Sequence, residues 1–143
     1  MTPKVMFLCS GNSARSQMAE GWLLHLAGDR FEVVSAGTEP SRVNPLAIAV
    51  MRERGIDISG HHSKPVGKFL GEHFQYLITV CDNAREKCPI FPGAVKRIHW
   101  PLEDPAAAVG REEERLAVFR RVRDEIETRI RAWIQEQSAP PRE

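Results

Sequence analysis

The chain has 143 residues, the usual size of a single domain, and its 42% hydrophobic and 27% charged residues are those of a globular protein rather than a disordered one. Lys and Arg number 20 against 19 Asp and Glu, so the formal net charge is +1, without the basic excess of a surface built for nucleic acid or an anionic membrane. No stretch approaches the roughly 20 apolar residues of a membrane span, and the start shows no secretory cleavage site. We therefore expect one domain over residues 1–143 in the cytoplasm, with neither nucleic acid nor membrane as a partner.

Short apolar runs that end in turn residues or proline alternate with longer stretches of helical character. The short runs predict strands at residues 5–8, 31–35, 76–80 and 95–100. The longer stretches predict helices at residues 13–27, 45–54, 66–73 and 116–134. This order and the apolar strands favour an α/β fold with a parallel sheet covered on both faces, although the link over residues 81–95 has no clear helix.

Three reactive residues come directly or shortly after predicted strands. Cys9 follows the first strand, Cys81 follows the third, and Asp104 comes soon after the fourth. Ligands of open α/β sheets bind beyond the carboxyl ends of the strands. We therefore expect these three side chains to gather at one edge of the sheet.

The turn after the first strand has the form Cys-x5-Arg-Ser. The spacing alone is weak evidence, but this copy lies between a buried strand and an amphipathic helix, where backbone N–H groups converge on an oxyanion. The expected oxyanion-binding residues are Ser10, Gly11, Asn12, Ser13, Ala14, Arg15 and Ser16. Gly11 permits the tight turn, and Arg15 adds a planar fork for two further oxygens. The positive field favours the nucleophilic thiolate of Cys9, and Ser16 is placed to donate a hydrogen bond to the sulfur.

A carboxylic acid downstream completes this chemistry. When a thiolate attacks an oxyanion, the departing hydroxide or alkoxide needs a proton, which a nearby carboxylic acid supplies. Glu103 and Asp104 lie in a loop bounded by Pro101 and Pro105, and both qualify by residue type.

The chain resembles the low-molecular-weight phosphotyrosine phosphatase superfamily and, within it, the thioredoxin-coupled arsenate reductases. The resemblance spans nearly the whole chain and rests on residues 9–20, Ser35-Ala36-Gly37, Thr79-Val80-Cys81-Asp82, Cys88-Pro89, His99-Trp100 and Asp104-Pro105. It implies a three-layer α/β/α fold whose four-stranded parallel sheet has the order 2-1-3-4. It also implies that Asp104, and not Glu103, is the acid.

The second and third cysteines distinguish two activities within this superfamily. A phosphatase needs only Cys9, Arg15 and the acid, whereas a reductase needs two electrons, which a pair of thiols supplies. The resemblance to the reductases implies that Cys9 attacks arsenate and that Cys81 then attacks Cys9, releasing arsenite. Cys88 next attacks Cys81, and reduced thioredoxin reduces the Cys81–Cys88 bond. Phosphate and sulfate would bind the same loop as analogues of arsenate.

Two alternatives remain open at this stage. The first is a low-molecular-weight tyrosine phosphatase that uses Cys9, Arg15 and Asp104. The single Tyr76 lies inside a predicted strand and residues 106–109 are Ala-Ala-Ala-Val, so no aromatic side chain is expected to grip a phosphotyrosine ring. The second is a redox sensor without enzymatic activity, for which no partner surface is evident.

Some relatives in this superfamily bind a monovalent cation beside the anion loop. The resemblance maps that site onto Asn12, Glu20 and Ser35 together with an acidic residue, but this chain has Lys64 at the acidic position. We expect the Lys64 ammonium to take the place of the cation and to donate hydrogen bonds to these oxygens. We expect no metal and no cofactor, and we expect a monomer.

Overall fold

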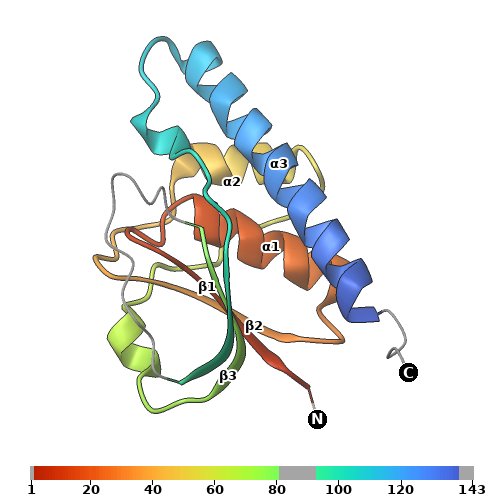
Figure 1. The fold of residues 1–143 in the computed structure, drawn as a ribbon. Coiled ribbons are helices and arrows are strands. Elements are labelled where there is room, and N and C mark those ends of the chain that lie inside the picture. The colour runs from red at the N-terminus through yellow and green to blue at the C-terminus, as the bar shows by residue number, and fades with distance from the viewer. Residues whose placement is uncertain (1, 81–92, 139–143) are drawn as a thin grey trace.

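The computed structural model describes residues 2–80 and 93–138, and it contains all four predicted strands (Figure 1). The strands are β1 (Lys4–Cys9), β2 (Glu32–Gly37), β3 (Phe74–Thr79) and β4 (Ala94–His99). The α-helices are α1 (Arg15–Ala27), α2 (Pro45–Arg52) and α3 (Glu112–Ser138), and the 3-10 helices are η1 (Val66–Phe69) and η2 (Pro105–Ala107). None of the helices in these described ranges is long and apolar enough to cross a membrane.

The sheet has the order β2-β1-β3-β4, and every neighbouring pair is parallel. This confirms the expected order 2-1-3-4. The parallel pairing of β3 with β4 was the pairing that the sequence supported least, because the link over residues 81–95 showed no clear helix. The register places Cys9 beside Gly37 on β2, and Leu8 beside Thr79 on β3. The carboxyl ends of the central strands therefore meet at one edge, as expected.

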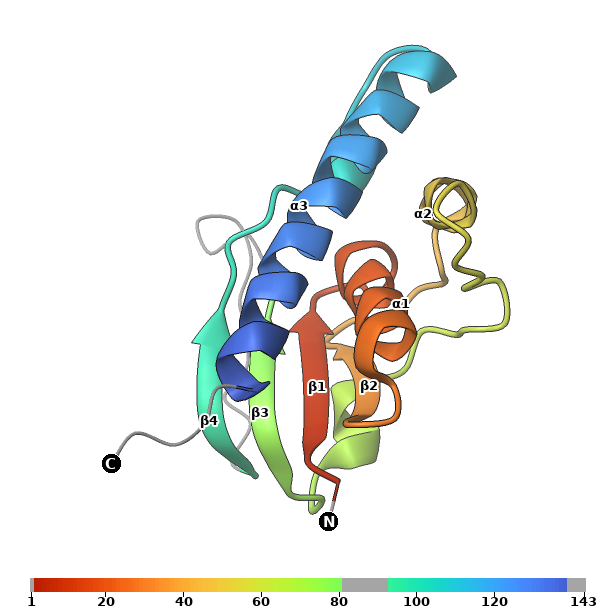
Figure 2. The ribbon, with the colours of Figure 1, turned by 90° about the vertical axis from the view of Figure 1, so that its right-hand side faces the viewer.

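Side chains of β1 alternate between the two faces of the sheet, because successive residues of a strand point to opposite sides. Val5, Phe7 and Cys9 belong to the larger core, which α1 and α3 cover, whereas Met6 and Leu8 belong to a smaller core on the other face. Figure 2 shows α1 and α3 crossing one face of the sheet and η1 lying behind it. The layered α/β/α arrangement is confirmed, with η1 forming the described part of the third layer.

The helix predicted at residues 66–73 is shorter than expected, since η1 ends at Phe69. Leu70 already has extended backbone angles, and Gly71 has a φ of 96°, which a helix does not accommodate. The left-handed glycine therefore ends the helical segment earlier than the sequence predicted.

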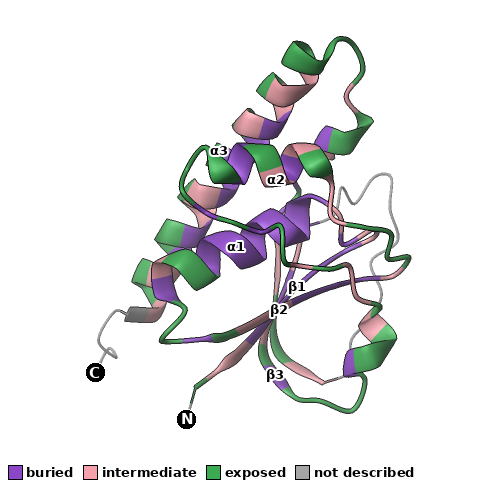
Figure 3. Cartoon of the chain, turned by 180° about the vertical axis from the view of Figure 1, so that it is seen from behind, coloured by how far each residue is buried: buried purple, intermediate pink, exposed green. Residues whose placement is uncertain are grey.

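The last helix starts earlier than its apolar pattern indicated, at Glu112 rather than residue 116. Its first turn is Glu112, Glu113 and Glu114, and negative charge there stabilises the N-terminal end of the helix dipole. Figure 3 shows the buried stripe of α3 facing α1 and the exposed residues on its outer side.

Candidate active site

The loop between β1 and α1 is held with its carbonyl oxygens turned outward. The carbonyl oxygens of residues 9–13 accept hydrogen bonds from atoms outside the loop: in order, Thr38 N (3.3 Å), Glu39 N (2.8 Å), Ser41 N (3.1 Å), Ser63 Oγ (2.7 Å) and Asn44 N (2.9 Å). In a planar trans peptide unit the N–H points opposite to the C=O. The N–H groups of residues 10–14 therefore point to the inner side of the loop, where an oxyanion would sit. We call residues 9–16 the anion loop.

Cys9 lies at the base of this loop in a chain of hydrogen bonds. Its Sγ is 2.9 Å from Ser16 Oγ, and Ser16 Oγ in turn accepts a hydrogen bond of 2.8 Å from Asn12 Nδ2. Because Asn12 supplies one proton to Ser16 Oγ, the single hydroxyl proton of Ser16 is available for the Cys9 sulfur. A hydrogen bond donated to the sulfur stabilises the thiolate, so the geometry agrees with the role expected for Ser16. All three residues are buried.

The tight turn does not depend on Gly11, contrary to the sequence-based expectation. The residue with left-handed backbone angles is Asn12, with a φ of 47°, and a Cβ at Gly11 would meet other atoms only at ordinary contact distances. Asn tolerates this region because its short side chain hydrogen-bonds locally. The glycine that the loop requires is Gly37 on β2, where a Cβ would lie 2.5 Å from Ser10 O and 2.9 Å from Asn12 N.

Arg15 brings the acid to the anion loop. Its buried guanidinium donates a hydrogen bond of 3.2 Å from Nη1 to Leu102 O, and its Nη2 lies 3.8 Å from Asp104 Oδ2. Asp104 Oδ1 accepts a hydrogen bond from Ala106 N at 3.0 Å, which caps η2. The structure therefore places Asp104 beside Arg15 of the anion loop, although the two residues are far apart in the sequence.

The other carboxylate of the same loop turns away from the site. Glu103 Oε1 accepts a hydrogen bond of 2.8 Å from Arg121 Nη1 on α3. The two carboxylates that qualified equally by residue type therefore face different partners, and Asp104 is the one beside Arg15.

The four residues of the cation-like site also lie together, but Lys64 is bound differently from the expectation. Glu20 accepts a hydrogen bond from Ser35 Oγ, and the Lys64 ammonium lies 3.8 Å from Glu20 Oε1 as an ion pair. The ammonium donates its hydrogen bond to His62 O at 2.9 Å, while Asn12 Oδ1 is bound by the backbone N–H of Lys64 at 2.9 Å. Burial lowers the pKa of Lys64, and Glu20 opposes that shift.

Gln17 was missed as a site residue from sequence. Its Nε2 donates to Asn12 O (3.2 Å), Asn12 Oδ1 (3.0 Å) and His62 O (3.1 Å), and its Oε1 lies 3.1 Å from His61 Nδ1. Gln17 thus ties the anion loop to residues 61–63, a contact between segments over forty positions apart that no local pattern shows. Its place within the motif after Arg15 was the one available signal.

Cys81 and Cys88 lie outside the described residues. The last described residue before them is Val80, whose N–H donates to Leu8 O at 3.0 Å, next to the start of the anion loop. Cys9 is a free thiol. Within residues 2–80 and 93–138, no group of three or more His, Cys, Asp or Glu side chains is arranged to hold a metal ion.

Known proteins share this fold. Residues 4–140 match the family of the low molecular weight phosphotyrosine protein phosphatases. The arsenate reductase of Bacillus subtilis (strain 168) is 47% identical over 131 residues, covering 92% of this chain and 94% of that protein. The solved structure of an arsenate reductase in the phosphate binding state has a TM-score of 0.81 and 40% identity, covering 95% of this chain and 98% of that one. The thioredoxin-dependent arsenate reductase of Corynebacterium glutamicum has a TM-score of 0.72 and 31% identity, covering 94% of this chain and 61% of that one. The chain therefore belongs to the low molecular weight phosphotyrosine protein phosphatase family, in which it is similar to arsenate reductases.

Proposed function

We propose that this protein is an arsenate reductase that converts arsenate to arsenite. The observation that carries the proposal is the anion loop itself, with inward N–H groups, the Cys9 sulfur hydrogen-bonded at its base and Arg15 beside Asp104. A tetrahedral oxyanion fits this arrangement, and two relatives named arsenate reductases are 47% and 49% identical to the chain.

The first step is attack of the Cys9 thiolate on the arsenic of bound arsenate. The loop N–H groups and the Arg15 fork stabilise the charge on the oxygens, and these donors are already in place before the substrate binds. Asp104 donates a proton to the departing oxygen, which leaves as water and gives a Cys9–arseno adduct. The contact of 3.8 Å between Arg15 Nη2 and Asp104 Oδ2 places this carboxyl next to the loop.

The later steps require two further thiols, for which Cys81 and Cys88 are the candidates. Cys81 attacks the Cys9 sulfur, so that the S–As bond breaks, its electron pair stays on arsenic as As(III), and arsenite leaves. Cys88 then attacks Cys81 and frees Cys9, and two thiols have supplied the two electrons. Thioredoxin is the proposed reductant of the Cys81–Cys88 bond, supported by the name of the Corynebacterium glutamicum relative.

Phosphate monoester hydrolysis is the second candidate activity, because arsenate and phosphate share shape and charge. The family match and the set of Cys9, Arg15 and Asp104 both favour it. The segment after Asp104 argues against phosphotyrosine as the main substrate. It is η2, which consists of Pro105, Ala106 and Ala107 and has no aromatic ring to pack against a phosphotyrosine ring. We therefore propose at most a side activity.

We propose that the protein works as a monomer in the cytoplasm. Reduced thiols are required for each step, and the reducing cytosol maintains them. The three cysteines of the sequence support this location, because an odd number cannot form a closed disulfide framework.

The proposal is tested by mapping thiols after arsenate is added to the fully reduced protein without thioredoxin. We expect one arsenite per chain and a Cys81–Cys88 disulfide in the mass spectrum of the digested protein. The Cys88→Ser variant should also release one arsenite but trap a Cys9–Cys81 bond. Free thiols throughout, with rapid hydrolysis of a phosphate monoester, would instead support the phosphatase.

A further inference from the structure

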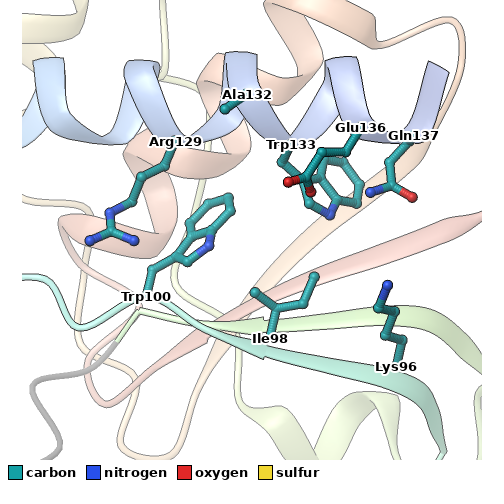
Figure 4. Close-up of a pocket in the computed structure, with 8 residues that line it drawn as sticks. All are labelled: Lys96, Ile98, Trp100, Arg129, Ala132, Trp133, Glu136 and Gln137. Carbon is teal, nitrogen blue, oxygen red and sulfur yellow. The ribbon is translucent and has the colours of Figure 1, made fainter. Parts of the chain in front are cut away.

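Polar groups are buried both far from the anion loop and directly against it. Far from the loop, a groove of about 390 Å³ lies between β4 and α3 (Figure 4). Its Lys96 and Glu136 carry opposite charges and its Trp133 Nε1 is buried, so the groove gives no reason to expect a charged ligand. Against the loop, the side chain of Gln17 on α1 is completely buried and donates hydrogen bonds to Asn12.

The contacts around Gln17 fix which way two side-chain amides point. The backbone N–H of Lys64 donates to Asn12 Oδ1 at 2.9 Å, so Asn12 Nδ2 is the atom that faces Ser16 Oγ. Gln17 Nε2 lies within 3.2 Å of three acceptors, two of them on Asn12, so Gln17 Oε1 is the atom that faces His61 Nδ1. Because an amide oxygen only accepts hydrogen bonds, His61 Nδ1 carries the proton of this 3.1 Å contact.

These orientations make a chain of hydrogen bonds in which every proton is donated in the direction of the Cys9 sulfur. The donors are, in order, His61 Nδ1, Gln17 Nε2, Asn12 Nδ2 and Ser16 Oγ. Hydrogen bonds arranged head to tail polarise one another, and the last of them stabilises negative charge on the sulfur. If the Asn12 amide turned over, its Oδ1 would accept the Ser16 proton and the sulfur would lose its donor.

We propose that Gln17 is a positioning residue, which keeps the Asn12 amide turned so that the Ser16 proton stays on the nucleophilic sulfur. Gln17 binds both the side chain and the backbone carbonyl of Asn12, the residue whose left-handed φ of 47° shapes the loop. His61 holds the Gln17 amide in turn, and Nδ1 donates this hydrogen bond in the neutral as well as the charged imidazole. The inference rests on the proposed function, in which Cys9 is the nucleophile.

The test is the pH dependence of Cys9 alkylation by iodoacetamide in phosphate-free buffer, measured by mass spectrometry on the tryptic peptide that contains Cys9. The midpoint of this profile reports formation of the thiolate, which is the reacting form. Ser16→Ala removes the direct donor and should raise the midpoint by about 1–2 pH units, as expected for a hydrogen bond to a charged group. Gln17→Met keeps the length of the side chain without its amide and should raise the midpoint by about 0.5–1 pH unit. Gln75→Met, at an exposed position of β3, is the control and should leave the midpoint unchanged.

A double variant separates positioning from a general loosening of the anion loop. If Gln17 acts through Ser16, Gln17→Met should add no further shift in the Ser16→Ala protein, because residues of one hydrogen-bond network do not contribute additively. Additive shifts would mean that Gln17 supports the loop by another route. Either additive shifts or an unchanged midpoint in Gln17→Met overturns the proposal.

Variants of the half-buried His61 test the same chain without a change in the core. His61→Phe removes the donor to Gln17 and should raise the midpoint by less than Gln17→Met does. His61→Asn should keep the wild-type midpoint, because its Nδ2 is bonded to Cγ as Nδ1 is in His and donates from the same place. His62→Phe, at the exposed neighbouring position, is the matched control.

A wild-type midpoint in His61→Phe, or an equal shift in His62→Phe, also overturns the proposal. Every readout is a property of the reduced protein without arsenate. Failure here is therefore separate from failure of the proposed activity, which would show as absent arsenite while the alkylation profiles still follow the expected order.

Discussion

The anion loop and the loop that carries Asp104 meet at Arg15 but are held in different ways. Carbonyl oxygens of the anion loop accept hydrogen bonds from residues 38–44 and from Ser63, and most of the loop is buried, namely Cys9, Asn12, Ala14, Arg15 and Ser16. The acid loop, residues 101–107, is anchored by Arg15 to Leu102 O and by an exposed ion pair between Glu103 and Arg121. The Asp104 side chain is 42% exposed, against 5% for Arg15.

This difference separates two tasks of the site. Binding and stabilising an oxyanion requires donors fixed before the substrate arrives, since their reorganisation would otherwise add to the barrier. Proton donation requires only that one carboxyl reach the departing oxygen and exchange protons with water. We therefore expect changes in the anion loop to affect both stability and activity, and changes in the acid loop to affect activity alone.

The largest effect is expected when the reacting groups of the anion loop are changed. Cys9→Ser should abolish turnover, because the alcohol is a far weaker nucleophile than a thiolate. Arg15→Lys keeps the positive charge but loses the planar guanidinium that donates two hydrogen bonds to the anion, and should lower kcat/KM by roughly 10²–10³-fold. Steady-state arsenite production measures both, and the exposed Arg111→Lys serves as the control. Retained multiple turnover in Cys9→Ser would disprove the assignment.

Asp104→Asn is expected to slow the first step by roughly 10²–10⁴-fold while changing the free energy of unfolding by less than about 0.5 kcal/mol. Asn keeps the oxygen that caps Ala106 N, so the loop retains its local structure. Rapid-quench measurement of arsenite formed in a single turnover reports the rate. The matched control is Glu103→Gln, which should keep the wild-type rate. An equal loss in Glu103→Gln would mean that the two carboxylates share the role.

Gly37→Ala is expected to destabilise the protein by about 1–3 kcal/mol, because the new Cβ would lie 2.5 Å from Ser10 O and must push the anion loop aside. Phosphate affinity should fall with stability. Urea unfolding and phosphate titration measure the two effects. Gly60→Ala is the control, since nothing lies within 4 Å of a Cβ there. Equal stability of both variants would show that the anion loop moves aside at little cost in the free energy of unfolding.

Lys64 is expected to remove any specific response to potassium, because its ammonium already faces Glu20. The melting temperature and activity should therefore respond equally to potassium and sodium at equal ionic strength. Lys64→Asp restores an acidic residue and should introduce a potassium-specific rise in melting temperature. A potassium-specific gain in the wild-type protein would contradict this role of Lys64.

The lowered pKa of Lys64 also has a consequence for stability at alkaline pH. Burial lowers the pKa from its ordinary value of 10.5, so above the lowered value the folded state gives up a proton that the unfolded state still holds. Stability contributed by this group therefore rises with pH between the two pKa values. The difference in unfolding free energy between wild type and Lys64→Met, measured across that range, should change in this direction.

The smallest effect is expected for the exposed pair that ties the acid loop to α3. Arg121→Ala removes the ion pair with Glu103 and should cost less than about 1 kcal/mol, since exposed pairs contribute little. Activity should stay within about twofold of the wild type. Thermal unfolding and turnover measure both. A large loss of activity would show that this pair positions Asp104 and would weaken the contrast between the two loops.

The sequence by itself determined the four strands, the long terminal helix and the position of the anion loop. These follow from local patterns, because the period of apolar residues and the turn residues act over a few positions. The Cys-x5-Arg spacing at a strand-to-helix junction likewise located Cys9, Arg15 and Ser16 together. The end of η1 was not predicted, because the sequence does not show which glycine adopts left-handed backbone angles, as Gly71 does.

Only the tertiary structure decided which groups face one another. Asp104 meets Arg15 while Glu103 turns to Arg121, although the two carboxylates are neighbours of the same charge. The left-handed residue is Asn12 rather than Gly11, and Gly37 is the glycine that the loop packs against. The ammonium of Lys64 donates to a backbone carbonyl rather than to the oxygens expected of it. Each outcome depends on a contact between segments distant in the chain, and hydrogen-bond geometry of that kind leaves no period or spacing in the sequence.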